Sequence, residues 1–526
     1  MIRVLDPTTA VTRAGQEIGT TAYVSDRLLV RGEQVWNRDR RVDEILAQFG
    51  WVLRPPERYR DEIPRRQPRA PFDLESQQVV SFELHVATES PSAAPDAWTA
   101  LQQIRTVVPE LDQSFELVHV FTASGGGGYW HGIGGGGYWH GIGGGGYWHG
   151  IGGGGYWHGI GTPDEYAVPG YGGKSPVAVV IDDPSKTAPR LKRPPVVVMP
   201  DTGIGPHPWF PDVAVVGVQP PPASLGVTVF GSSVADATDG VGSRLTGGLD
   251  DLAGHGTFIA GIVRQICPPA RLVAHAIMGS DGLVYEDAVL DLLQKLLDTQ
   301  LAALASGDTA AVIDVLTLSF GGYHEDVPDE DSDPSVLSGS SLATMLRDLG
   351  RAGVLVVAGA GNDATTRPFV PAAFAGDTAT GKGGLPLVSV GSLNPDRSKV
   401  SLFSNAGAWV TTYRHGAAIV STLPQRQNAS SQASTNVPGI ATLPENDQPA
   451  AREGKLSTPQ DRATIDLDNF SSGFGIWSGT SFAAPVLAGQ LASALVSLGT
   501  DTADLDSLVK RGWAALTKVL RPIRRS

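Results

Sequence analysis

The segment Ser478-Gly479-Thr480-Ser481-Phe482-Ala483-Ala484-Pro485 forms a tight turn that carries a serine, and an apolar run to about Leu498 follows it. The run predicts a buried helix with Ser481 in its first turn, where backbone N–H groups and the positive end of the helix dipole lie. An attacking oxygen and a developing oxyanion are best stabilised at such a place. Ser and Thr are also ordinary helix caps, so this segment alone leaves both a nucleophile and a capping residue open.

The composition is that of an acidic, globular chain of 526 residues, long enough for two or three domains. Its formal charge of −14, from 40 basic and 54 acidic residues, argues against a nucleic-acid partner. The one cysteine, Cys267, lies in an apolar helical run and is expected to be a buried thiol. Pro485, Gly489 and Gln490 interrupt the longest apolar run, so we expect no membrane span. The N-terminus lacks the pattern of a secretory signal, which favours a cytoplasmic location and leaves export by another route open.

The N-terminal part is divided into a loose leader at residues 1–20, which shows no periodicity, and a small α+β domain at residues 21–123. The apolar pattern of this domain predicts the order βαββαβ. Strands are expected at Tyr23–Val30, Trp51–Arg54, Val79–Ala87 and Phe115–Phe121, and helices at Arg41–Phe49 and Ala97–Val108.

Residues 124–194 are interpreted as a glycine-rich repeat and linker. Gly-Gly-Gly-Gly-Tyr-Trp-His-Gly-Ile occurs four times, beginning at Gly125, Gly134, Gly143 and Gly152. A flexible spacer is the favoured interpretation, because so many glycines make ordering entropically costly. The alternative is a metal-binding array of the four repeat histidines, although no acidic or cysteine ligand recurs with them.

Residues 195–500 alternate apolar strands with helices, which predicts an α/β domain whose parallel sheet is covered on both faces. A polar insertion at 424–470 interrupts this domain, and residues 501–526 are expected to form a C-terminal helix and a basic tail. Strands are expected at Val196–Met199, Arg271–Ile277, Val312–Ser319, Val354–Ala358 and Leu387–Val390, and helices at His255–Ile266, Glu286–Ala305, Ser340–Ala352 and Phe482–Leu498.

Three segments place a reactive residue among glycines or threonines at the end of a strand or the start of a helix. Asp201-Thr202-Gly203 follows the first strand of this region, Gly254-His255-Gly256-Thr257 opens a helix, and Gly479-Thr480-Ser481 opens the last apolar helix. A serine hydroxyl becomes a nucleophile when a histidine removes its proton, and a carboxylate must orient that histidine. Each residue alone also fits a turn or a cap, but their joint occurrence predicts a catalytic triad.

These segments resemble the subtilisin-like serine peptidases, the subtilase family, over about residues 195–499. The resemblance implies a subtilisin-like three-layer fold with a mainly parallel central sheet. It also implies a serine endopeptidase that hydrolyses peptide bonds of polypeptide substrates through an acyl-enzyme, with Asp201, His255 and Ser481 as the triad.

The resemblance extends to further binding residues. Ala360-Gly361-Asn362 matches the oxyanion motif of the family and implies Asn362 as a donor, with a turn-capping asparagine as the alternative. Ser319-Phe320-Gly321-Gly322 resembles the edge that pairs with the substrate backbone, and Gly359-Ala360-Gly361 resembles the opposite wall of the specificity pocket. The implied substrate-binding residues are Ser319, Phe320, Gly321, Gly359, Ala360 and Gly361, although Phe320 also fits a core position.

The chain departs from the family's pattern at two places. Pro200 precedes Asp201, so we expect the strand to end or bulge there. The N-terminal domain is similar to the family's prodomain, which implies a contact with the catalytic domain. Because the glycine-rich segment between the two domains is long, two alternatives stay open. The N-terminal domain is retained as an accessory module, or it is removed by self-cleavage within 161–195.

The acidic run from Glu325 to Asp333 is expected to be a solvated loop, with a preference for basic substrates or Ca2+ binding as alternatives. It lacks the EF-hand pattern, so no metal and no cofactor is assigned. The alternative to an enzyme is an inactive or self-inhibited binding protein on a peptidase fold, whose N-terminal domain blocks the cleft.

Overall fold

The computed structural model describes residues 1–123, 174–210, 252–377, 383–425, 427 and 470–520, apart from residues 14, 60, 66–68, 88–92, 178 and 180. It also describes four short backbone strands within residues 211–251. The glycine-rich repeat, most of the polar insertion at 424–470 and the basic tail at 521–526 lie outside the described residues.

An eight-stranded parallel sheet forms the centre of the larger domain, in the order β18-β17-β16-β14-β7-β12-β9-β8. Strands β7, β14 and β16 are buried at every residue, as expected of apolar strands covered on both faces. The eight strands are β7 (Val196–Asp201), β8 (Val215–Val216), β9 (Val227–Phe230), β12 (Arg271–Ala276), β14 (Val315–Leu318), β16 (Leu355–Gly359), β17 (Leu387–Leu393) and β18 (Thr412–His415).

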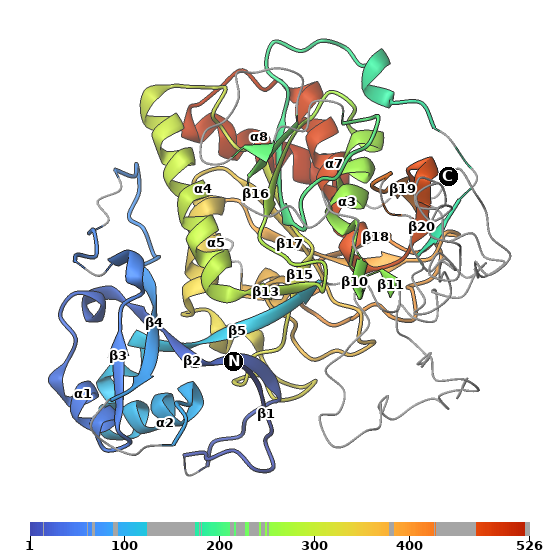
Figure 1. Ribbon diagram of the computed structural model, residues 1–526. Coiled ribbons are helices and arrows are strands. Elements are labelled where there is room, and N and C mark those ends of the chain that lie inside the picture. The colour runs from blue at the N-terminus through green and yellow to red at the C-terminus, as the bar shows by residue number, and fades with distance from the viewer. Residues whose placement is uncertain are drawn as a thin grey trace, which may run out of the picture.

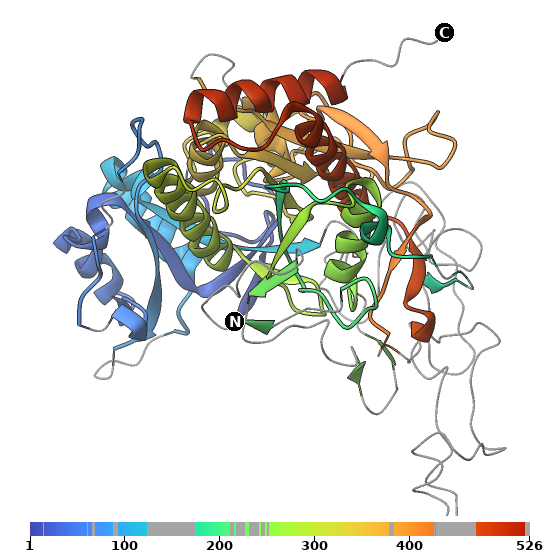
Figure 2. The same cartoon turned by 90° about the horizontal axis from the view of Figure 1, so that it is seen from above.

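Helices cover both faces of this sheet (Figures 1 and 2), which confirms the predicted α/β class. One face carries α3 (His255–Ile266) and α7 (Thr480–Leu498), with α8 (Leu505–Leu520) packed on α7. The other face carries α4 (Glu286–Ser306) and α5 (Ser341–Arg351). The length and hydropathy of α7 would let it cross a membrane, but α7 packs in the hydrophobic core.

Local sequence signals set where these helices begin and end. The side chain of Ser340 accepts a hydrogen bond from Ala343 N (3.3 Å) and caps α5. Helix α4 ends at Ser306, and the residue that caps it is Gly307, whose φ of 70° costs a glycine little. A smaller antiparallel sheet at the edge of the domain contains β6 (Ser175–Pro176), β19 (Ile419–Thr422) and β20 (Phe474–Trp477), and a separate hairpin contains β10 (Val241–Ser243) and β11 (Gly248–Leu249).

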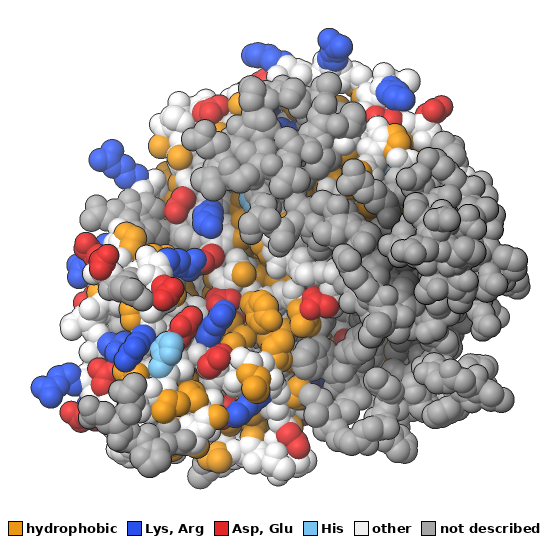
Figure 3. Space-filling view, in the orientation of Figure 1, with side chains coloured by type: hydrophobic (Ala, Val, Ile, Leu, Met, Phe, Trp, Pro, Cys, Tyr) orange, Lys and Arg blue, Asp and Glu red, His pale blue; other side chains and the backbone are white. Residues whose placement is uncertain are grey.

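The N-terminal domain has the predicted βαββαβ order and its own hydrophobic core. Its elements are β2 (Thr21–Arg31), α1 (Arg40–Ala47), β3 (Trp51–Arg54), β4 (Val79–Val86), α2 (Ala97–Val107) and β5 (Phe115–Ala123). The prediction of a loose leader is wrong for Ile2–Leu5, which forms β1 and pairs antiparallel with β2. Four residues are too few to show a periodic pattern. Charged side chains of both signs are mixed over this domain (Figure 3), in exposed pairs such as Arg41 with Asp39.

Strand β5 joins the two domains into one antiparallel sheet. Its far edge is β13 (Leu283–Tyr285) of the larger domain, and its last residues also pair with β15 (Phe320–Gly321). The register places Val284 opposite Phe121, and Ala123 opposite Phe320. The N-terminal domain is therefore attached by main-chain hydrogen bonds to segments on both sides of β5 (Figure 1).

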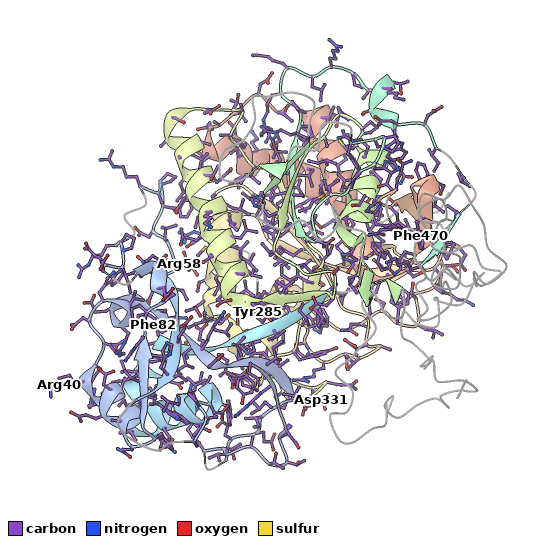
Figure 4. The ribbon with its side chains drawn as sticks, in the orientation of Figure 1. Arg40, Arg58, Phe82, Tyr285, Asp331 and Phe470 are labelled. Atoms are coloured by element: carbon purple, nitrogen blue, oxygen red, sulfur yellow. The ribbon has the colours of Figure 1, made fainter. Side chains whose placement is uncertain are left out.

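Side chains add to this attachment along α4 and α5. Arg58 faces α4 in Figure 4 and donates to Asp291 Oδ2 (2.6 Å). Glu116 of β5 accepts from Ser341 N (3.2 Å), so a carboxylate of one domain caps the N-terminus of a helix of the other. Arg31 also binds Glu116 (2.8 Å), and this pair is largely shielded from solvent.

The expected end or bulge of the strand at Pro200 is wrong. Strand β7 continues to Asp201, and its parallel register with β12 is unbroken through His275–Pro200 and Ala276–Asp201. The neighbour on the other side, β14, pairs only with Val197 and Val198. No hydrogen bond of the β7–β14 pair therefore needs an N–H at position 200, which proline lacks. The carbonyl of Asp201 accepts from Ile277 N (3.0 Å), which places Asp201 at the carboxyl end of the sheet.

Candidate active site

Asp201 and His255 form a buried pair at the carboxyl end of the sheet. Asp201 ends β7 and His255 is the first residue of α3, and the side chains of both are almost completely shielded from solvent. His255 Nδ1 lies 2.8 Å from Asp201 Oδ1. Because a carboxylate only accepts hydrogen bonds, this contact places a proton on Nδ1 and leaves Nε2 as the acceptor. Nε2 is buried and has no hydrogen-bond partner among the described residues.

The glycines beside His255 allow this close packing. A Cβ on Gly256 would overlap the carbonyl oxygen of Gly203, so only glycine lets α3 approach the aspartate segment. Gly254 has a φ of 86°, and a Cβ there would lie 2.7 Å from Cδ2 of Leu423. Thr202 Oγ1 then accepts from Gly256 N (2.8 Å) and ties the two segments together.

Ser481 lies in the first turn of α7, beside an unusual backbone arrangement. Pro485 has no N–H to donate to the carbonyl of Ser481, four residues earlier. Ser319 Oγ donates to that carbonyl instead (2.9 Å). Proline is tolerated here because a side chain replaces the lost helical hydrogen bond, and the same bond fixes Ser319 against the serine segment.

The hydroxyl of Ser481 donates to the carbonyl oxygen of Ser319 (3.0 Å), so in this rotamer it is not bonded to His255. The ring of the next residue, Phe482, lies 5.2 Å from the His255 ring, centroid to centroid, and Trp477 packs edge-on against the same ring at 5.6 Å. Catalytic hydrogen bonds are often unformed before substrate binds, and rotation about χ1 of Ser481 changes the acceptor.

Asn362 contacts the first turn of α7. Its Oδ1 accepts from Thr480 N (2.9 Å), and Thr480 Oγ1 accepts from Gly361 N (3.0 Å). Because the N–H of Thr480 must face an acceptor, the amide of Asn362 is oriented with Oδ1 toward Thr480. Its Nδ2 is then a buried donor with no partner among the described residues. A donor held in this way next to the Ser481 turn is suited to bind a negatively charged oxygen.

Comparisons with known proteins place the larger domain in a family. The sequence profile described as Subtilase family, peptidase S8, matches residues 196–503, which is more than half of the chain. The chain belongs to the subtilase family. No curated protein sequence matches it.

Two solved structures similar to this subtilase are more distant. One is a cold-adapted subtilisin-like serine proteinase, with 17% identity over 60% of this chain and 80% of the other, and a TM-score of 0.35. The other is fervidolysin from Fervidobacterium pennivorans, a keratinolytic enzyme related to subtilisin, with 16% identity over 93% of this chain and a TM-score of 0.41. This chain covers 56% of the length of fervidolysin. Similarity at this level carries no information on substrates.

The segments expected to bind substrate lie on either side of α7's first turn in this subtilase. Ser319 leads into β15. Gly359 is the last residue of β16, and Gly361, two residues later, donates to Thr480 Oγ1. Strand β15 is already paired with Ala123 and Thr122 of β5. Phe320 is fully buried, and its ring stacks on Phe121 of β5 with centroids 6.3 Å apart, so it packs against the strand that occupies the edge.

A second buried histidine escaped the sequence analysis. His119 of β5 contacts Glu286 Oε2 through Nδ1 (2.6 Å) and Glu325 Oε2 through Nε2 (2.7 Å). His324 lies against the same ring, with centroids 4.5 Å apart. Burial alone would lower the pKa of His119, but the two carboxylates raise it well above its ordinary value.

The acidic run is exposed as expected at Asp326, Asp329, Glu330, Asp331 and Asp333, and the interpretation as a solvated loop is wrong only for Glu325, which is 1% exposed and belongs to this cluster. The charges of His324 and His119 outweigh the effect of burial and lower the pKa of the Glu325 carboxyl. Ligand atoms of His119, His324 and Glu325 lie within 4.8 Å of one another, a spacing that also suits a metal. Both ring nitrogens of His119 already face carboxylates, so hydrogen bonds account for the cluster without one.

Proposed function

We propose that this subtilase is a serine endopeptidase, with Ser481 as nucleophile, His255 as general base and then acid, Asp201 as its orienting carboxylate and Asn362 as an oxyanion donor. The observation that carries the proposal is the buried His255–Asp201 pair, which leaves the Nε2 acceptor beside the helix that bears Ser481. An imidazole held by a single carboxylate in this way can take a hydroxyl proton.

The reaction then follows from the geometry. His255 Nε2 accepts the Ser481 proton as Oγ attacks the carbonyl carbon of the scissile bond, and Asp201 stabilises the imidazolium. Nδ2 of Asn362 and the first-turn N–H groups of α7 stabilise the negative charge that develops on the carbonyl oxygen. The imidazolium gives its proton to the leaving amine, and water attacks the acyl-enzyme by the same route.

The pairing of β5 with β15 supports a peptide substrate that binds as an added strand. Along β5 the chain passes Gly321 and then Phe320, and so runs toward Ser319, whose carbonyl accepts from Ser481. The N-terminal domain thus occupies the edge as a substrate would. We expect self-cleavage at the bonds that follow Ala123, rather than within 161–195.

The test uses a fluorophosphonate, which labels activated serines. Wild type should be labelled, and Ser481→Ala should not. Ser497→Ala, on the same helix, is the matched control and should be labelled like wild type, since its hydroxyl donates to Ala494 O (2.7 Å) and accepts from Lys518 Nζ (2.6 Å) at the opposite end of α7 from Ser481. Labelling that persists in Ser481→Ala would refute the assignment.

The alternative is a self-inhibited binding protein, and one observation favours it. The side chains of Ser481 and His255 are fully buried while β5 pairs with β15. Mass spectrometry of the purified full chain over time separates the two functions. If the protein is an enzyme, wild type gives two fragments separated by a cut just after Ala123, and Ser481→Ala gives none. If it is an inactive scaffold, wild type and Ser481→Ala both stay intact.

A further inference from the structure

The aromatic ring of Phe369 fills the space between the two glycine segments expected to form the specificity pocket. A Cβ built on Gly361 would lie 3.0 Å from Cγ of Phe369. A Cβ built on Gly321, in the opposite segment, would overlap Cε1 of the same ring and lie 2.9 Å from Cζ. The ring therefore reaches from one wall to the other.

Hydrogen bonds and ring contacts hold Phe369 in this place. Gly322 and Val370 exchange both main-chain hydrogen bonds (2.8 and 2.9 Å), which fixes the backbone beside the ring. Tyr323 packs edge-on against Phe369, with centroids 5.3 Å apart at 73°. Phe369 is 3% exposed, so the ring is part of the packed interior rather than a movable cover.

Tyr323 is itself anchored on the opposite wall. Its hydroxyl donates to Asp363 Oδ2 (2.7 Å) and accepts from Asn405 Nδ2 (3.2 Å). Burial raises the pKa of Tyr323 far above its ordinary value, and Asp363 raises it further, so the hydroxyl keeps its proton and the bond persists. The guanidinium of Arg367 lies over the Tyr323 ring at 4.6 Å. A ring supported in this way resists displacement by a substrate side chain.

We propose that Phe369 is the residue that determines specificity, by closing the pocket to large side chains. The substrates are then polypeptides with glycine, alanine or serine immediately before the scissile bond. In this proposal a peptide on the β15 edge directs that side chain between Ser319–Gly322 and Gly359–Gly361, the two segments that contact the turn carrying Ser481. This inference rests on the proposed peptidase function.

The chain's own sequence offers an independent argument. Strand β5 approaches Ser481 from the side of an incoming peptide, and its last residue is Ala123. The sequence continues as Ser124 and then Gly125–Gly128, with no side chain larger than serine before Tyr129. In sequence, the residues that directly follow β5 therefore carry only side chains that a closed pocket accepts.

The experiment measures kcat/KM of the full-length protein on peptides that differ only in the residue before the scissile bond, alanine or phenylalanine. Wild type should favour alanine by at least about 100-fold. Phe369→Ala should lower that ratio at least tenfold by raising turnover of the phenylalanine peptide. Phe369→Leu removes less volume, so it covers the case in which the alanine variant fails to fold. It should lower the preference for the alanine peptide over a peptide with leucine before the scissile bond.

Phe374→Leu is the matched control, because it shortens another buried phenylalanine of the same segment and should leave the ratio unchanged. A wild type that prefers phenylalanine would overturn the inference, as would an unchanged ratio in a folded, fluorophosphonate-labelled Phe369→Leu. Absence of both labelling and turnover in wild type would instead refute the peptidase function, so the two failures are distinguishable.

Discussion

His255 and His119 are both buried imidazoles beside carboxylates, and they differ in how many carboxylates face the ring. His255 contacts one, Asp201, through Nδ1, and its Nε2 has no partner among the described residues. His119 contacts Glu286 through Nδ1 and Glu325 through Nε2. One histidine lies within the larger domain, and the other joins β5 to α4 and to the loop after β15.

The second carboxylate changes what the ring can do. A single carboxylate fixes the tautomer and leaves a nitrogen to accept a substrate proton. Two carboxylates hold a proton on each nitrogen, because neither carboxylate can donate, and the ring becomes a fixed cation. The raised pKa of His119 agrees with this. The same side chain is therefore suited to catalysis in one place and to domain attachment in the other.

The largest effect is expected from His255→Ala, which removes the proton acceptor. Turnover should fall by at least about 10⁴-fold, since serine, histidine and carboxylate act as a unit. Circular dichroism should show a folded protein. Turnover within tenfold of wild type would mean that His255 is not the base.

His119→Gln should act on stability rather than chemistry. It removes the cation that contacts Glu286 and leaves Glu325 with only His324 Nδ1 (3.5 Å) beside it, and breaking a buried ion pair costs about 3–5 kcal/mol. Chemical denaturation should show this loss in the free energy of unfolding. Once self-cleavage is complete, kcat should match wild type, and a large drop in kcat would place His119 in the catalytic machinery after all.

The contribution of His119 depends on pH with a definite sign. Its folded pKa lies above the unfolded value near 6.5, so its stabilisation is present in full below that value and is lost as pH rises through the folded pKa. The wild-type melting temperature should therefore fall on the alkaline side more steeply than that of His119→Gln. Parallel curves would show that His119 carries no bound proton into the folded state. The groups that face it are Glu286 on α4 and Glu325 and His324 in the loop after β15.

Asn362→Ala tests the proposed oxyanion donor, Nδ2 of Asn362, which would act together with His255. Removal of one oxyanion donor lowers kcat by about 10²–10³-fold and leaves KM nearly unchanged. The change also removes the acceptor for Thr480 N, so the melting temperature of the variant must be measured beside its kinetics. An equal loss in kcat and binding would indicate a structural role instead.

The smallest effect is expected from His85→Gln, the control for His119→Gln. The His85 side chain is 44% exposed, and its contact with Glu83 (3.2 Å) lies on the surface. Exposed pairs contribute less than about 1 kcal/mol. A loss comparable to that of His119→Gln would show that burial is not what distinguishes the two histidines.

The sequence predicted the parts of this molecule that are locally encoded. Strands such as Leu355–Gly359 are apolar runs between helices, and the Asp201, His255 and Ser481 segments each combine a reactive residue with small neighbours. The short strands β18 and β19 carry no such run and were missed, and so was β20, whose apolar run is only four residues long. The His119 cluster was also missed, because Glu286 and Glu325 lie 167 and 206 residues away in sequence.

Phe369 shows the same limit at the candidate site. Nothing in its neighbouring residues indicates that its ring lies between Gly321 and Gly361. That position follows from the pairing of Gly322 with Val370, which only the folded chain creates. Sequence patterns therefore located the predicted catalytic residues, while the shape of the pocket depended on tertiary contacts.

The position of β5 between β13 and β15 also bears on aggregation. Strand edges with unpaired N–H and C=O groups are templates for any extended chain, and proteins generally cover them. In this subtilase both edges are covered while β5 is in place. Departure of β5 would expose two short edges that face each other across a gap one strand wide. The exposed edges that would bind a polypeptide substrate would then also bind a misfolded neighbouring chain. Release of the N-terminal domain would therefore lower the solubility of the protein as well as open the site.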